Sequence, residues 1–169
     1  TINIPDIGGG CVNYVGWFVN YERPTYVIAD ESALESILTA FRSIGIDNIA
    51  GYFPTEVIDQ GQTASMQVVR ANELSHQLQD LHAVILDVRG LGEYSEEHIS
   101  GAIHIPLGYL PRHLDEIPRD QPVITQCASG YRSQIAASLL RSYGFDNVIN
   151  LRDNKDAWKK ALPIETNYP

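Results

Sequence analysis

A chain of 169 residues, 44 % of them hydrophobic, is long enough for one packed domain and part of a second. Its formal net charge of −9 repels phosphate backbones and anionic headgroups, so we expect neither nucleic acid nor a membrane among its partners. Two cysteines cannot build a disulfide framework, and so few cysteines are typical of a reducing compartment. No apolar run approaches about 18 residues, so we expect no membrane span and predict a cytoplasmic protein.

The predicted elements begin in residues 1–53. Ile2 to Pro5 is interpreted as a short strand, and Pro24 to Ile28 predicts another because it is apolar and β-branched. A helix is expected over 32–44, ended by Gly45 in left-handed conformation. We interpret this region as the C-terminal half of one module.

A linker and a complete module are predicted to follow. Residues 54–66 are mostly polar, with a proline, a glycine and no clear period, which is typical of a linker. Residues 67–169 alternate strands and helices, which predicts an α/β domain with a mainly parallel central sheet. Its expected elements are a helix from an N-cap at Asn72 to about Leu81, strands over 83–88 and 122–126, and a helix over 131–143 that Gly144 ends.

An internal repeat links the two regions. Residues 42–49 (RSIGIDNI) and 141–148 (RSYGFDNV) are identical at five of eight positions, 99 positions apart. Aligned on the preceding strands, Ala29 stands where the second copy has Cys127. Asp30 and Glu31 follow, and two carboxylates would repel an anionic substrate. The partial module is therefore expected to be catalytically inactive.

Cys127 is the strongest candidate for a catalytic residue. It lies between an apolar strand and a helix, where backbone N–H groups and the positive end of the helix stabilise an anion. Arg132 adds a positive charge, so a thiolate is predicted. Because the loop contains no histidine to act as a base, the pattern points away from acyl-transfer enzymes. The substrate-binding residues expected beside Cys127 are Ala128, Ser129, Gly130, Tyr131 and Arg132.

Four segments of the second module resemble the rhodanese (sulfurtransferase) domain. They are Leu86–Arg89, Glu93–Pro106, Cys127–Ser133 and Asn150–Lys160. The resemblance implies a three-layer rhodanese-like fold over about residues 67–165. It also implies that Cys127 carries a sulfane sulfur, from thiosulfate or a related persulfide donor, to a thiophilic acceptor. The loop amides would cradle the persulfide, and Arg132 would help to bind an anionic donor.

Two other functions stay open. The related phosphatases have a Cys-x5-Arg loop, and the shorter Cys-x4-Arg loop from Cys127 to Arg132 favours a sulfur atom over a phosphate. A sulfur-carrier or regulatory module without independent turnover is the second alternative. The chain departs from the family at Asp153-Asn154, where rhodaneses usually have Gly-Gly. Asp and Asn tolerate left-handed geometry, so we expect the turn to survive.

Other polar residues of the second module have weaker signals. Asp87 and Arg89 follow a buried strand, and either support the loop or form a structural ion pair, with Glu93 as another candidate partner. His98 and His104 are expected in turns or at the surface, without a catalytic role. These histidines, Asp87 and His113 lack metal-ligand spacing, so we expect no metal and no cofactor. Trp158 is expected in the core, and Cys11 is either a bystander or a resolving thiol.

The first region resembles the inactive middle module of metallo-β-lactamase–rhodanese fusion proteins, some of which are persulfide dioxygenases. The segments that resemble it are Ile2–Pro5, Gly16-Trp17 and Ala50–Phe53. This resemblance implies an upstream domain of metallo-β-lactamase fold with a non-haem iron, besides small sulfur-containing substrates, as partners.

Overall fold

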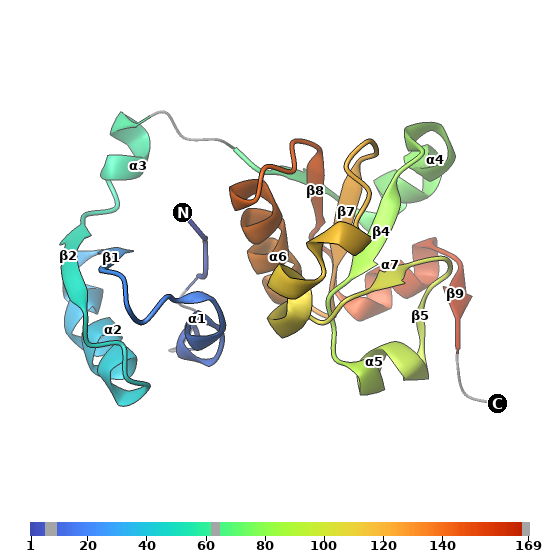
Figure 1. Cartoon of the computed structure of the whole chain (residues 1–169). Helices are drawn as coiled ribbons and strands as arrows, with labels where there is room; N and C mark the ends of the chain where they lie inside the picture. The colour runs from blue at the N-terminus through green and yellow to red at the C-terminus, as the bar shows by residue number, and fades with distance from the viewer. Residues whose placement is uncertain (6–9, 62–64, 167–169) are drawn as a thin grey trace. The chain divides into compact units, whose positions relative to one another are not determined.

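The computed structural model describes residues 1–5, 10–61 and 65–166 (Figure 1). It divides into two compact units, which are described separately. The N-terminal unit is Ile4–Ser65, and the C-terminal unit is Met66–Pro169 together with Thr1–Asn3. No helix in the described part of the chain is both long and apolar enough to cross a membrane.

The C-terminal unit is built on a five-stranded sheet in the order β3-β8-β7-β4-β6 (Figure 1). Every pairing in it is parallel. The predicted mainly parallel α/β fold is therefore confirmed for this unit. A separate antiparallel pair joins β5 (His98–Ile99) to β9 (Ile164–Glu165). The strands of the main sheet are β3 (Gln67–Val69), β4 (Val84–Asp87), β6 (Ile103–His104), β7 (Val123–Gln126) and β8 (Val148–Leu151).

Helices cover both faces of this sheet. Ile124 and Leu151 pack in one hydrophobic cluster with Leu74 of α4 and Trp158 of α7. Successive strand residues point to opposite faces, and the hydroxyl of Thr125 donates to the Ser133 carbonyl of α6, so α6 covers the other face. The helices are α4 (Ala71–Leu81), α5 (Leu91–Glu96), α6 (Tyr131–Ser142) and α7 (Lys155–Ala161), with 3-10 turns η1 (Leu107–Arg112) and η2 (Leu114–Glu116).

The N-terminal unit contains a parallel pair of strands connected by a helix. β1 pairs with β2, and α2 crosses between them. Its core gathers Val27, Ile37, Phe41 and Ile46, and Cys11 is buried among them. The elements are α1 (Val12–Phe18), β1 (Thr25–Ile28), α2 (Glu31–Ser43), β2 (Ile49–Phe53) and α3 (Val57–Gln60).

The internal repeat is a repeat of backbone geometry. Gly45 and Gly144, which end α2 and α6, both have φ of 81°. The N–H of Thr25 donates to the Asn48 carbonyl over 2.8 Å, and that of Val123 donates to the Asn147 carbonyl over the same distance. The matched residues thus form equivalent strand–helix–strand elements in the two units.

The structure adds to the predicted elements of this region and corrects one of them. Ile2–Pro5 forms no strand, so this prediction was wrong. It was based on the match to residues 103–106, which contain β6, but β6 is a strand because it pairs with β4. Helix α1 was not predicted. The segment 54–66 contains α3, whereas its residues 62–64 lie outside the described residues.

The N-terminus of α4 also differs from the prediction. Its N-cap is Arg70 rather than Asn72. The first N–H of the helix, that of Ala71, donates to the Asp153 carboxylate over 2.7 Å. A side chain distant in sequence therefore supplies the cap that was sought locally.

Candidate active site

Cys127 lies between the end of β7 at Gln126 and the start of α6 at Tyr131. Its side chain is buried, and the Gly130 N–H donates to Sγ over 3.2 Å. Sγ lies 3.5 Å from the Ser133 hydroxyl oxygen. A backbone N–H and the start of a 12-residue helix both favour negative charge on the sulfur. The site thus has the features of a nucleophilic thiol.

Gly130 is the residue that lets the loop close around the sulfur. Its φ is 87°, which residues with a side chain rarely adopt. A Cβ added there would lie 2.6 Å from the carbonyl oxygen of Arg152. Glycine is therefore required twice, for the backbone conformation and for the close approach of the segment after β8.

The loop is held from outside by hydrogen bonds to its carbonyls. The Cys127 carbonyl accepts a hydrogen bond from the side-chain amide Nε2 of Gln126 over 2.7 Å and another from the Trp158 indole N–H over 3.2 Å. The Lys155 N–H donates to the Ala128 carbonyl over 2.9 Å. These bonds fix the strand-side half of the loop from β7 and α7.

Trp158 and Ser133 were not predicted as parts of the site. Trp158 is fully buried, as expected for a core residue, but a buried indole N–H needs an acceptor, and this requirement was the signal for its contact with the loop. Ser133 is also fully buried, and its hydroxyl donates to the Gly130 carbonyl over 3.1 Å. Both residues brace the loop that presents Cys127.

Arg132 is engaged in an ion pair. Its Nη1 and Nη2 donate to the two carboxylate oxygens of Glu93 over 2.6 and 2.7 Å. Glu93 lies in α5, and its carboxylate also accepts from the Gly90 N–H over 3.2 Å. The hydrogen bond from Arg132 is the main cause of a pKa of Glu93 below its usual value. Glu93 was named as a partner of Asp87 or Arg89, and it pairs with Arg132 instead.

Asp87 and Arg89 form a fully buried ion pair with each other. Nη2 of Arg89 lies 2.6 Å from the Asp87 carboxylate and 2.8 Å from the Glu97 carbonyl. Among the described residues, Nη1 of Arg89 has no hydrogen-bond partner, and the guanidinium lies 5.2 Å from the ring centre of Trp158. This pair therefore adjoins the residue that holds the Cys127 carbonyl.

The other predicted loop residues are more exposed than Cys127. Ser129 is exposed, whereas Ala128 and Tyr131 are half-buried. The structure thus brings together Cys127, its loop and Arg132. Asp87 and Arg89 lie behind them, with Trp158 between.

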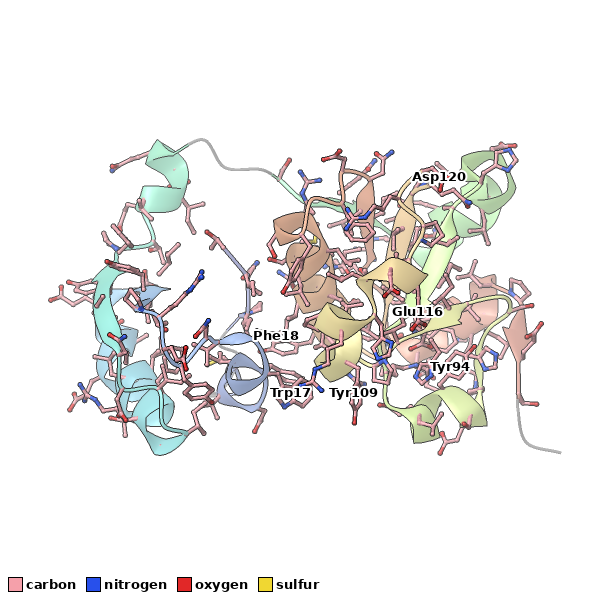
Figure 2. The ribbon with its side chains drawn as sticks, in the orientation of Figure 1. Trp17, Phe18, Tyr94, Tyr109, Glu116 and Asp120 are labelled. Carbon is pink, nitrogen blue, oxygen red and sulfur yellow. The ribbon has the colours of Figure 1, made fainter. Side chains whose placement is uncertain are left out.

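His98 and His104 form a stack with Tyr94. The Tyr94 ring, labelled in Figure 2, lies 3.9 Å from the His98 ring and 4.1 Å from the His104 ring, measured between centroids. His98 is 3 % exposed, so the predicted surface position is wrong for it. Burial of this stack raises the pKa of Tyr94 above its usual value. Packing against the Tyr94 ring is therefore the structural role of both histidines.

The two residues that replace the expected Gly-Gly act as helix caps. Neither Asp153 nor Asn154 has positive φ, so the expectation of left-handed geometry was wrong. The Asn154 side chain accepts from the Ala157 N–H over 3.1 Å and caps α7, while Asp153 caps α4. Capping of two helices therefore explains why these polar residues stand there.

A family model described as the rhodanese-like domain matches residues 70–161, more than half of the chain. The chain belongs to the rhodanese-like family. A sulfurtransferase of Allochromatium vinosum is 36 % identical over 98 residues, which cover 57 % of this chain and 92 % of that protein. Thiosulfate sulfurtransferase GlpE of Actinobacillus pleuropneumoniae is 36 % identical over 87 residues, covering 51 % and 81 %. Relatives of this rhodanese-like chain are thus named for sulfur transfer.

Solved structures agree with this assignment. The rhodanese-like domain of the Anabaena Alr3790 protein superposes with a TM-score of 0.54 at 29 % identity, covering 61 % of this chain and 80 % of that one. A rhodanese-related protein of Thermoplasma volcanium gives 0.53 at 25 % identity, covering 59 % and 97 %. The predicted rhodanese resemblance is therefore confirmed, whereas the resemblance of residues 1–53 to the fusion proteins stays a prediction.

Proposed function

We propose that this rhodanese-like chain is a sulfurtransferase that works through a persulfide on Cys127. The observation that carries the proposal is the hydrogen bond from the Gly130 N–H to Sγ, over 3.2 Å, within a loop that only glycine allows. Relatives named thiosulfate sulfurtransferase support thiosulfate as one donor. The substrates are small sulfur-containing molecules, and Cys127 is the nucleophile.

The reaction has two displacements at sulfur. The Cys127 thiolate attacks the sulfane sulfur of the donor, so that a new S–S bond forms and the donor's S–S bond breaks. The leaving group, sulfite in the case of thiosulfate, takes the electron pair of the broken bond. A thiophilic acceptor such as cyanide then attacks the outer sulfur and restores the thiolate. N–H donors of the loop stabilise the negative charge of the persulfide between the two steps.

The test is a thiosulfate:cyanide assay of the purified full chain. Thiocyanate formation is expected in the parent protein and should vanish in Cys127→Ser, because a hydroxyl cannot accept the sulfur. Cys11→Ser is the matched control, since Cys11 is also buried but belongs to the N-terminal core, and it should retain activity. Full activity of Cys127→Ser would disprove the mechanism.

A sulfur carrier without turnover is the second candidate. The putative sulfur carrier protein YrkF of Bacillus subtilis is 39 % identical over 74 residues, which cover 44 % of this chain and 40 % of that protein. Intact-mass measurement after treatment with thiosulfate separates the candidates. A mass increase of one sulfur atom on Cys127, without thiocyanate formation, would favour the carrier; turnover favours the enzyme.

We also propose that the N-terminal unit is an inactive counterpart of the catalytic element. Ala29 follows β1 as Cys127 follows β7, but only Asp30 separates it from α2. Four residues, Cys127–Gly130, stand between β7 and α6. The shorter connection has neither a thiol nor a ring of amides, which supports an inactive module. The upstream metallo-β-lactamase-fold partner remains part of this proposal, and sequencing the gene upstream of Thr1 would test it.

A further inference from the structure

The ion pair between Glu93 and Arg132 lies at the end of the loop that begins with Cys127. Arg132 is the only basic residue from Cys127 to Arg132, so it is the loop's own means of binding an anionic donor. Both of its terminal nitrogens already donate to Glu93, over 2.6 and 2.7 Å. An anionic group therefore has to compete with a carboxylate for the guanidinium.

Glu93 is held firmly in this position. It is the N3 residue of α5, and the Gly90 N–H at the start of that helix donates to the same carboxylate that binds Arg132. The hydrogen bond from Arg132 lowers the pKa of Glu93, so the carboxylate stays charged at neutral pH. The competitor of an anionic donor is thus a hydrogen-bonded carboxylate that is negatively charged at neutral pH.

Other cations that support the loop are also paired. Lys155, whose N–H donates to the Ala128 carbonyl, has its Nζ 2.7 Å from Glu97 and 3.7 Å from Glu96. Arg89 behind Trp158 is paired with Asp87. Each of these positive charges is thus paired with a carboxylate, as that of Arg132 is.

We propose that Glu93 is a specificity-determining residue that disfavours doubly charged donors such as thiosulfate and favours the persulfides of uncharged organic thiols. This inference rests on the proposed persulfide chemistry of Cys127. A persulfide donor is recognised at its sulfane sulfur and brings no sulfonate that requires Arg132. The Cys127 thiolate attacks the outer sulfur of R–S–SH, giving Cys–S–SH, and the leaving R–S⁻ takes the electron pair of the broken S–S bond.

The test compares two donors in the 169-residue chain, with cyanide as the acceptor for both. The donors are thiosulfate and the persulfide of 2-mercaptoethanol, and thiocyanate is the measured product. Glu93→Gln removes the negative charge but keeps an oxygen for the Gly90 N–H. We expect kcat/KM for thiosulfate to rise about fivefold, mainly through a lower KM, the size expected for a partly exposed ion pair. The value for the organic persulfide should stay within about twofold.

Two further variants show whether the effect is local. Glu96→Gln makes the same charge change in the same helix, at an exposed residue that pairs with Lys155 rather than Arg132, and should leave the donor ratio unchanged. In Glu93→Gln/Arg132→Gln the gain with thiosulfate should disappear, because the released guanidinium is gone. Thermal unfolding of each variant checks that the fold is retained.

Three results would overturn the inference. They are equal changes of kcat/KM for both donors in Glu93→Gln, a loss of activity with both, and a Glu96→Gln variant that behaves as Glu93→Gln does. A parent protein that forms no persulfide on Cys127 with either donor would instead refute the proposed function. The two failures are therefore distinguishable.

Discussion

At the scale of single residues, the geometry of the site depends on a few positions with no chemistry of their own. Gly130 places its N–H on the Cys127 sulfur because its φ of 87° turns the backbone there. Trp158 and Ser133 hold the loop through carbonyl oxygens. The reactive thiol is therefore presented by residues that are not nucleophiles themselves.

Gly130→Ala is predicted to reduce sulfur transfer strongly. The new Cβ would lie 2.6 Å from the Arg152 carbonyl, so the loop has to move and the N–H leaves the sulfur. We expect a loss of activity of at least about tenfold in the thiosulfate:cyanide assay, besides a destabilisation of about 1–3 kcal/mol. Gly144→Ala is the matched control, since its φ is 81° but no atom lies within 4 Å of the added Cβ. It should lose only about 1–2 kcal/mol of stability and keep its activity.

At the scale of elements, the same strand–helix–strand unit occurs in two different environments. Tyr26 stands at the repeat position of Ile124, although a register shift between Thr25 and Tyr26 moves its partner by one residue, so that Tyr26 pairs with Gly51 where Ile124 pairs with Ile149. Ile124 is fully buried beneath α4 and α7, whereas Tyr26 is 57 % exposed. Ile28 and Phe53, farther along the same pair of strands, are also exposed. Parallel sheets are normally covered on both faces. Among the residues that the structure describes, helices cover both faces only in the C-terminal unit.

This difference predicts a large loss of stability for one of two matched substitutions and a small loss for the other. Ile124→Ala should destabilise the C-terminal unit by about 2–5 kcal/mol, because it leaves a cavity among fully buried side chains. Tyr26→Ala, at the corresponding position, should cost less than about 1 kcal/mol. Urea unfolding followed by circular dichroism measures both values. A large cost at Tyr26 would show that this face is covered.

At the scale of the whole molecule, the two units have separate cores. One cluster contains Phe41 and Ile37 of the N-terminal unit, and another contains Ile124 and Trp158 of the C-terminal unit. The proposed catalytic residues all belong to the C-terminal unit. Unfolding of the N-terminal core should therefore leave the rate of sulfur transfer unchanged.

Phe41→Ala tests this independence. Removing a buried phenyl ring should cost about 3–5 kcal/mol, enough to unfold a unit of this size. Because each unit contains one tryptophan, Trp17 or Trp158, fluorescence of the full chain reports on both. We expect a changed Trp17 signal and an unchanged rate of thiocyanate formation. A parallel loss of activity would show that the N-terminal unit supports the site.

The sequence by itself determined the features that are local along the chain. Helices α2 and α6, their terminal glycines and the repeat between them follow from periodicity and from short-range backbone geometry. Cys127 was recognised because a strand, a loop of small residues and a helix are contiguous.

Only the tertiary structure decided which distant side chains meet. Arg132 was expected to bind an anionic donor, yet its guanidinium is paired with the carboxylate of Glu93, 39 positions away. Asp153 was expected to replace a glycine, yet it caps α4, 82 positions away. The physical reason is the same in both cases. Hydrogen-bond and charge requirements of a residue can be read from its type, but the partner that satisfies them is set by how the elements pack.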